Sequence, residues 1–116
     1  MAKDIQRVLS KYGIEVEKLG RGGYSKSIMM EEPDHCYFCG DANCDWHEVI
    51  YGTANRGKSK ALGLWISVCR MHHVVLHNPK TDEEKEAAEK LKQEAQKRLD
   101  EKYGEGTFFR IYGRNV

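Results

Sequence analysis

The sequence predicts a small α+β protein, in which a β-hairpin and a helix in the middle of the chain lie between helices at both ends. Its 116 residues suit one domain. Two short runs rich in aromatic and β-branched residues, at about 45–51 and 64–68, favour strands. Apolar residues at helical spacing lie before and after these runs, which favours flanking helices.

The first 27 residues are expected to form a helix and a flexible linker outside the main domain at 28–116. Apolar residues repeat at helical spacing over residues 3–12, namely Ile5, Val8, Leu9 and Tyr12, and Gly13 can end that helix. The stretch "GRGGYSKS" has no periodicity, so we expect a flexible loop there. Residues 27–30 are expected to form a short strand that leads into the domain.

The middle of the chain is expected to contain a cysteine turn at 36–39, the two strands, a loop at 52–60 and a helix from about Arg70. The helix over 81–103 has the strongest signal. Thr81 and Glu84 have the spacing of a capping box, and Gly104 can end the helix. The closing "TFFRIYGRNV" is apolar and aromatic, and we expect it to dock on the core.

Charge and composition limit the possible functions. The formal net charge is +1, which argues against a protein that is basic over its whole surface, so any attraction to phosphate must come from a local cluster. No run approaches the roughly 20 apolar residues of a membrane span, and the N-terminus lacks the apolar part of a secretion signal. We therefore expect a cytoplasmic protein without membrane partners, whose four cysteines bind metal rather than form disulfides.

A structural zinc site is predicted from two ligand pairs. Cys36 and Cys39 form a C-x2-C turn followed by Gly40. Cys69 and His72 are three residues apart, so they share a face of one helical turn. Three thiolates and one imidazole suit tetrahedral zinc.

A rival set uses the C-x2-H pair of Cys44 and His47 with the same two cysteines of the turn. It would be a compact finger-like site. However, it leaves Cys69 and the three histidines at 72, 73 and 77 without a role.

A second metal site is predicted because His73 and His77 remain once His72 is assigned to zinc. They are four residues apart and share a helix face, rotated by roughly a quarter turn from that of Cys69 and His72. One helix can therefore present ligands to two separate ions. A third ligand must come from elsewhere in the chain, and His47 lies in the stretch "DWHEVIYGTANRGKSK".

Four motifs resemble those of HNH endonucleases of the ββα-metal (His-Me finger) superfamily, of a small type found in bacteriophages and prophages. They are "CYFCG", "WHEVIYGTANRGKS", "GLWISVCRMHHVVLHN" and "FRIYGRN". The resemblance covers about residue 28 to the C-terminus. It implies a zinc-stapled ββα-metal hairpin and helix, a catalytic divalent cation (Mg²⁺, Mn²⁺, Ni²⁺ or Zn²⁺), and, for a phage protein, the cytoplasm of a bacterial host.

The resemblance also implies roles for individual residues. His73 and His77 resemble the helix ligands of the catalytic metal, and the "HEV" at 47–49 resembles the strand motif. Two roles stay open there: His47 is a metal ligand with Glu48 at the position of the general base, or His47 is the base and Asp45 has to serve as ligand. The pattern also departs in its middle asparagine, since Gly63 stands near the expected position. Asn55 is the nearest candidate, for holding the loop or orienting the histidine.

Two functions are therefore compared. The first is a metal-dependent endonuclease that hydrolyses DNA with little sequence specificity, in which Arg56, Lys58 and Lys60 bind flanking phosphates. The second is a non-catalytic zinc module that binds nucleic acid or protein. His73 and His77 distinguish them, because a purely structural zinc unit does not need these residues.

Overall fold

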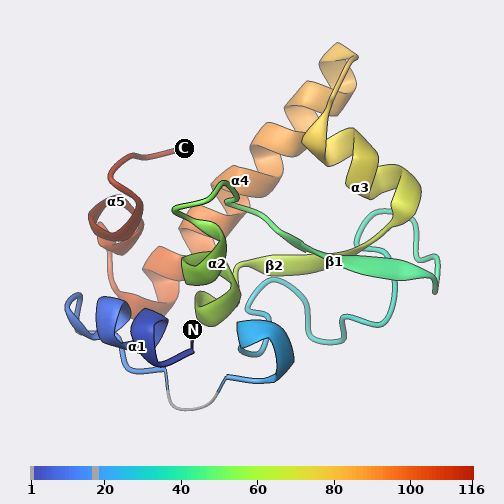
Figure 1. The fold of residues 1–116 in the computed structure, drawn as a ribbon. Helices are drawn as coiled ribbons and strands as arrows, with labels where there is room; N and C mark the ends of the chain where they lie inside the picture. The colour runs from blue at the N-terminus through green and yellow to red at the C-terminus, as the bar shows by residue number, and fades with distance from the viewer. Residues whose placement is uncertain (1, 17–18) are drawn as a thin grey trace.

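The computed structural model describes residues 2–16 and 19–116, and over these residues it confirms the predicted α+β class. The elements in chain order are α1 (Ala2–Ser10), the short 3-10 helix η1 (Arg21–Gly23), β1 (Cys44–Glu48), α2 (Arg56–Leu62), β2 (Trp65–Cys69), α3 (Arg70–His77), α4 (Asp82–Tyr103) and α5 (Thr107–Tyr112). Figure 1 shows the hairpin near the middle of the molecule, with α4 running diagonally past it from α3 towards α5 and α1.

The two strands form an antiparallel hairpin whose register runs from Cys44 opposite Cys69 to Glu48 opposite Trp65. Both strands lie where the sequence predicts them, within a few residues at each end. Every residue of β2 is buried, as expected for a strand covered on both faces. In β1 the burial is uneven, because Trp46 is exposed while His47 and Glu48 are buried.

Two sequence expectations are wrong. Residues 27–30 form no strand, because the Ser27 hydroxyl accepts hydrogen bonds from the backbone N–H groups of Met29 and Met30 and bends the chain. The expected loop at 52–60 is a loop only up to residue 55, since α2 begins at Arg56. Helix α2 is held by tertiary contacts: the buried Ser59 hydroxyl donates to the carbonyl of Ile50 at 2.6 Å.

Helices α3 and α4 confirm their predictions. Helix α3 starts directly at the end of β2, with Cys69 as its N-cap residue. Helix α4 has the predicted capping box, in which the Glu84 amide donates to the Thr81 hydroxyl at 3.1 Å and the Thr81 amide donates to the Glu84 carboxylate at 3.2 Å. The C-terminal segment docks on the core as expected, with Phe108 and Ile111 of α5 buried.

The described residues of the N-terminal segment pack against the rest of the fold. Leu9 and Ile14 belong to the same hydrophobic core as the hairpin. The Ser25 amide donates to the carbonyl of Lys60, and the carbonyl of Ser25 accepts from the indole N–H of Trp65. Residues 1, 17 and 18 of the expected helix and linker lie outside the described residues, and the domain division at residue 27 stays a prediction.

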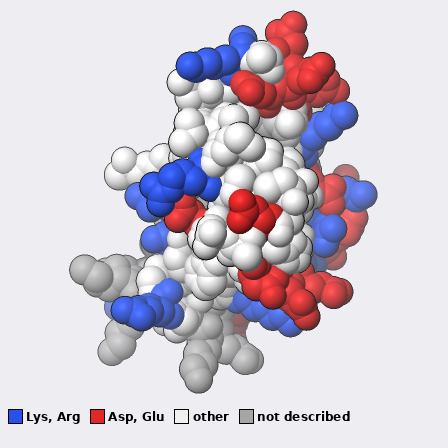
Figure 2. Space-filling model, turned by 90° about the vertical axis from the view of Figure 1, so that its right-hand side faces the viewer, with Lys and Arg blue, Asp and Glu red and all other residues white. Residues whose placement is uncertain are grey.

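Charged residues of both signs lie on the surface. Figure 2 shows one face, on which basic and acidic side chains are interspersed among uncharged ones and an acidic group lies near the middle. This mixture agrees with the net charge of +1. None of the helices in the described part of the chain has both the length and the apolar character needed to cross a membrane.

Candidate metal centres

The four predicted zinc ligands lie together and can hold a metal ion such as zinc. Cys36 and Cys39 come from the turn before β1, and Cys69 and His72 come from the junction of β2 and α3. Nδ1 of His72 lies 3.1 Å from Sγ of Cys69 and 3.5 Å from Sγ of Cys36, and Sγ of Cys39 lies 3.8 Å from Sγ of Cys69. Ligands bound tetrahedrally at Zn–S ~2.3 Å and Zn–N ~2.0 Å stand about 3.5–3.8 Å apart, so the group is close to zinc geometry.

The backbone of the cysteine turn is fixed by its own hydrogen bonds and by the hairpin. The Cys36 amide donates to the carbonyl of Asp41, and the Gly40 amide donates to the carbonyl of Cys36. Gly40 has φ of +80°, which glycine adopts easily. The Tyr37 amide donates to the carbonyl of Ser67 in β2, which ties the turn to the strand leading to the other two ligands.

The pKa values of two of the thiols are shifted in opposite directions. Burial acts to raise the pKa of Cys36, but N–H groups of Cys69, Cys39 and Phe38 outweigh it and lower the pKa to about 6. For Cys39, a backbone hydrogen bond at Asp41 acts to lower the pKa, but burial and the neighbouring thiols raise it to about 11. Closely spaced thiolates repel one another, and a dication relieves that repulsion.

The rival zinc set is not assembled. Sγ of Cys44 donates to the carbonyl of Asp41 at 3.0 Å instead of joining the other cysteines. His47 lies with His73 and His77, and the two groups of possible ligands share no residue.

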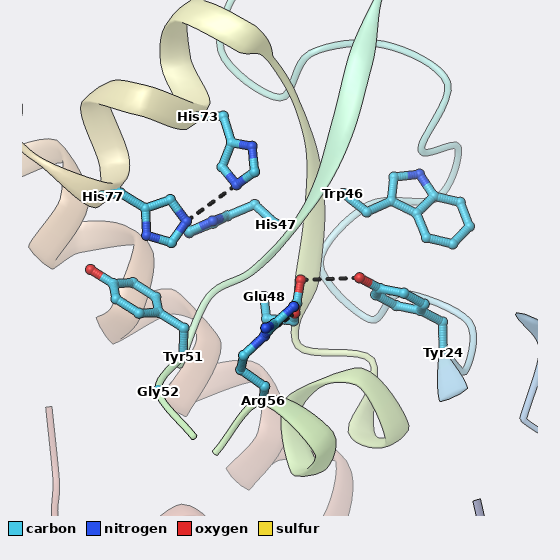
Figure 3. Close-up of a pocket in the computed structure, with 9 residues that line it drawn as sticks. All are labelled: Tyr24, Trp46, His47, Glu48, Tyr51, Gly52, Arg56, His73 and His77. Carbon is cyan, nitrogen blue, oxygen red and sulfur yellow. Dashed lines mark hydrogen bonds and ion pairs between the residues drawn. The ribbon is translucent and has the colours of Figure 1, made fainter. Parts of the chain in front are cut away.

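His47, His73 and His77 form a second group that can hold a metal ion, with one nitrogen from each ring within 4.8 Å of the others. Nε2 of His73 and Nε2 of His77 lie 3.2 Å apart, close to the ~3.3 Å that separates two nitrogens on one tetrahedral zinc. The ring of His47, from β1, meets both helix rings edge to face, with centroids 5.1 and 4.9 Å away (Figure 3).

The surroundings disfavour a positive charge on two of these imidazoles and orient the third. Burial, assisted by His77 and His73, lowers the pKa of His47 to about 3, and burial also lowers the pKa of His77. Nδ1 of His47 is buried and has no hydrogen-bond partner among the described residues. An Asp45 oxygen lies 3.5 Å from Nδ1 of His73, which favours a proton on that nitrogen and leaves Nε2 free as a ligand atom.

Glu48 follows His47 in β1 but makes a different set of contacts. Its carboxylate accepts a hydrogen bond from the Tyr24 hydroxyl at 3.0 Å and from Nε of Arg56 at 3.0 Å. The Glu48 side chain is 7% exposed and that of Arg56 is 60% exposed. Burial, followed by the charge and hydrogen bond of Glu48, raises the pKa of Tyr24 to about 12, so this hydroxyl stays a donor. All three line a cavity of about 310 Å³ with the histidines (Figure 3).

The remaining predicted residues, Asn55, Lys58 and Lys60, do not all lie at the histidine cavity. The Asn55 side chain donates to the carbonyl of Tyr51 at 3.3 Å, which suits its expected role in holding the loop. Nζ of Lys60 lies 5.1 Å from the centre of the Tyr24 ring, near the cavity. Nζ of Lys58 instead donates to the carbonyl of Ile111 in α5, so it is not brought together with Arg56.

Comparison with known proteins gives no relative: no family model, no curated protein and no solved structure matches the chain. The family resemblance therefore stays a prediction. Sequence reasoning missed Tyr24 and Tyr51 in the histidine cavity. Tyr24 lies in a glycine-rich stretch without periodicity, and only its aromatic character next to basic residues distinguishes it.

Proposed function

We propose that the protein is a metal-dependent endonuclease that hydrolyses phosphodiester bonds of DNA with little sequence specificity of its own. One observation carries the proposal. Three imidazoles converge beside a largely exposed arginine, in a cavity separate from the Cys/His group that suits structural zinc. A protein that uses metal only for folding does not need this second group. The motifs that resemble HNH endonucleases support the same reading.

In this proposal the histidines of the cavity bind a cation and Arg56 binds a phosphate. His47, His73 and His77 would hold a divalent cation, which when bound neutralises charge on the phosphate and the leaving oxygen and makes a nearby water more acidic. Since Nε of Arg56 is engaged by Glu48, its terminal N–H groups are available to a phosphate as a planar donor pair.

Glu48 acts in this scheme as a positioning residue for Arg56. Both of its oxygens already accept hydrogen bonds, one from Tyr24 and one from Arg56. With both oxygens engaged in this way, Glu48 is better placed to hold Arg56 than to accept a proton from water. The His47 ring contacts the helix histidines, whereas the carboxylate contacts Arg56 and Tyr24 (Figure 3).

The test is nicking of supercoiled plasmid by the zinc-loaded protein with Mg²⁺, Mn²⁺ or Ni²⁺, and with EDTA as the metal-free control. His73→Ala should lower cleavage by at least about 100-fold and leave the fold intact, because even outer partners of metal ligands are worth ~10–100-fold. His35→Ala is the matched control, since His35 is half exposed and pairs with Asp34 outside the cavity.

Two outcomes would overturn the proposal. If His73→Ala cleaves as fast as the wild type, the three histidines do not hold a catalytic cation. If the folded, zinc-loaded wild type nicks DNA with none of these ions, the conclusion becomes the alternative, a zinc module that binds nucleic acid or protein without catalysis.

A further inference from the structure

A second cavity, of about 420 Å³, adjoins the histidine cavity and shares Tyr24 and Trp46 with it. Its lining is mainly apolar and aromatic, with Trp65 as a further wall. Volumes of about 300–1,000 Å³ are typical of sites for small organic groups. The two cavities therefore meet at Tyr24 and Trp46, with possible metal ligands lining one and aromatic rings lining the other.

The rings of the aromatic wall are held by contacts with one another and by hydrogen bonds, and one large ring stays accessible. Trp46 is 44% exposed although it stands beside the buried His47 in β1. Its ring lies on that of Trp65, with centroids 4.3 Å apart and planes 30° apart, and it meets Tyr24 edge to face at 4.9 Å. Trp65 is fixed by its indole N–H bond to the Ser25 carbonyl, and Tyr24 is fixed by its bond to Glu48. The fold thus presents a preorganised indole at little cost in conformational freedom.

The charges around this cavity suit an anionic backbone. Arg21 and Lys26 line it, and Lys60 lies over the Tyr24 ring. Glu31 is the one acidic residue among its described lining residues. Arg56 continues the basic side chains into the histidine cavity. Aromatic rings interleaved with basic side chains are the combination that binds single-stranded nucleic acid, through base stacking and phosphate contacts.

We propose that the aromatic cavity takes an unpaired base of the DNA strand whose phosphate lies at the histidines, so that the preferred substrate is single-stranded or locally unpaired DNA. The inference rests on the proposed nuclease function and names its substrate class. A base in a duplex is stacked and paired and must be extruded before it can enter such a cavity, whereas an unpaired base enters without that cost. Stacking tolerates every base, which agrees with low sequence specificity.

The test is equilibrium binding of three fluorescent DNA probes of equal length to the zinc-loaded protein, with Ca²⁺ in place of a cleavage-supporting ion. The probes are a single strand, the matching duplex, and a single strand of abasic sugar-phosphate units. The single strand should bind roughly 10-fold or more tightly than the abasic strand, which has the same phosphates but no bases to stack. The single strand should also bind more tightly than the duplex.

Three variants connect the effect to the cavity. Trp46→Ala should bind the base-containing and abasic strands alike, whereas Trp46→Phe should keep most of the difference because it keeps a stacking face. Phe109→Ala is the matched control, since Phe109 is an aromatic residue with 51% exposure in α5. Thermal melting of each variant checks that the fold is retained.

Equal binding of the base-containing and abasic strands by the wild type, or an unchanged preference in a folded Trp46→Ala protein, would overturn the inference. Binding and cleavage are separate readouts. If the binding preference depends on Trp46 but no nicking occurs, base binding in the aromatic cavity is supported and the nuclease function is rejected. If nicking occurs without that preference, the nuclease function is supported and base binding in the aromatic cavity is rejected.

Discussion

Replacing Gly63 by alanine should destabilise the protein more than the same change at an ordinary left-handed glycine. Gly63 ends α2 with φ of +79° and ψ of +18°. A Cβ atom there would lie 2.4 Å from the carbonyl oxygen of Lys26 and 3.1 Å from the amide nitrogen of Ile28. Both are backbone atoms, so the segment around residues 26–28 has to move. That movement strains the hydrogen bond in which the Ile28 amide donates to the Gly63 carbonyl at 2.9 Å.

Gly13 provides the matched control. Its φ is +76°, nearly the value of Gly63, but an added Cβ would meet nothing within 4 Å. Gly13→Ala should therefore cost only the left-handed backbone penalty, about 1 kcal/mol. Gly63→Ala carries the same penalty together with the overlap, and overpacking typically costs ~1–3 kcal/mol, so its loss should be about 2–4 kcal/mol.

Urea unfolding of the zinc-loaded protein measures both losses, provided that the slope of the transition is the same for each variant. A result in which Gly63→Ala loses no more stability than Gly13→Ala would refute the reasoning, because it would mean that residues 26–28 do not press on the end of α2. The expected difference would instead show that the close contact between residues 26–28 and the end of α2 is kept in the folded protein.

Two further predictions concern the candidate sites. Cys39→Ala should lose bound zinc and unfold, because the free energy of metal binding contributes to folding in so small a domain. Cys44→Ala should keep one zinc per chain, and equal zinc content in the two purified variants would contradict the assignment. Glu48→Gln keeps an oxygen acceptor for Arg56, so it should mainly raise KM and lower kcat by less than 10-fold. A fall in kcat of about 10²–10⁴-fold would identify Glu48 as the general base.

The parts of the fold that could be predicted from the sequence have local signals. Thr81 and Glu84 announce the start of α4 because a capping box needs only residues three apart. The two groups of metal ligands were predictable for a similar reason, since the C-x2-C turn and the H-x3-H spacing each supply half of a site. A hairpin between the two ligand pairs was expected to bring them together, and the antiparallel pairing of β1 and β2 confirms that hairpin.

The parts that were missed depend on contacts between distant residues. Helix α2 has the sequence "RGKSKAL", which is short, basic and interrupted by glycine, so its helical spacing is weak. Its position is fixed by Ser59, which is fully buried between the carbonyl of Ile50 and the hydroxyl of Tyr112. Tyr24 reaches Glu48 across 24 residues of sequence, from the segment that the sequence predicts to be a flexible loop. No local pattern predicts such contacts.

Helix α3 contributes residues to both groups of possible metal ligands, and we expect the two groups to depend on each other unequally. It begins at Cys69 and carries His72 towards the cysteine turn, and it carries His73 and His77 towards β1. Loss of the zinc ligands should release the start of α3 and so displace both helix histidines from His47. Loss of His73 removes one donor from a partly exposed position and leaves the start of the helix in place. We therefore expect the Cys/His group to support the position of the histidine cluster, and not the reverse. If the proposed nuclease function is correct, His73→Ala should lose cleavage but keep its stability, whereas Cys39→Ala should lose both.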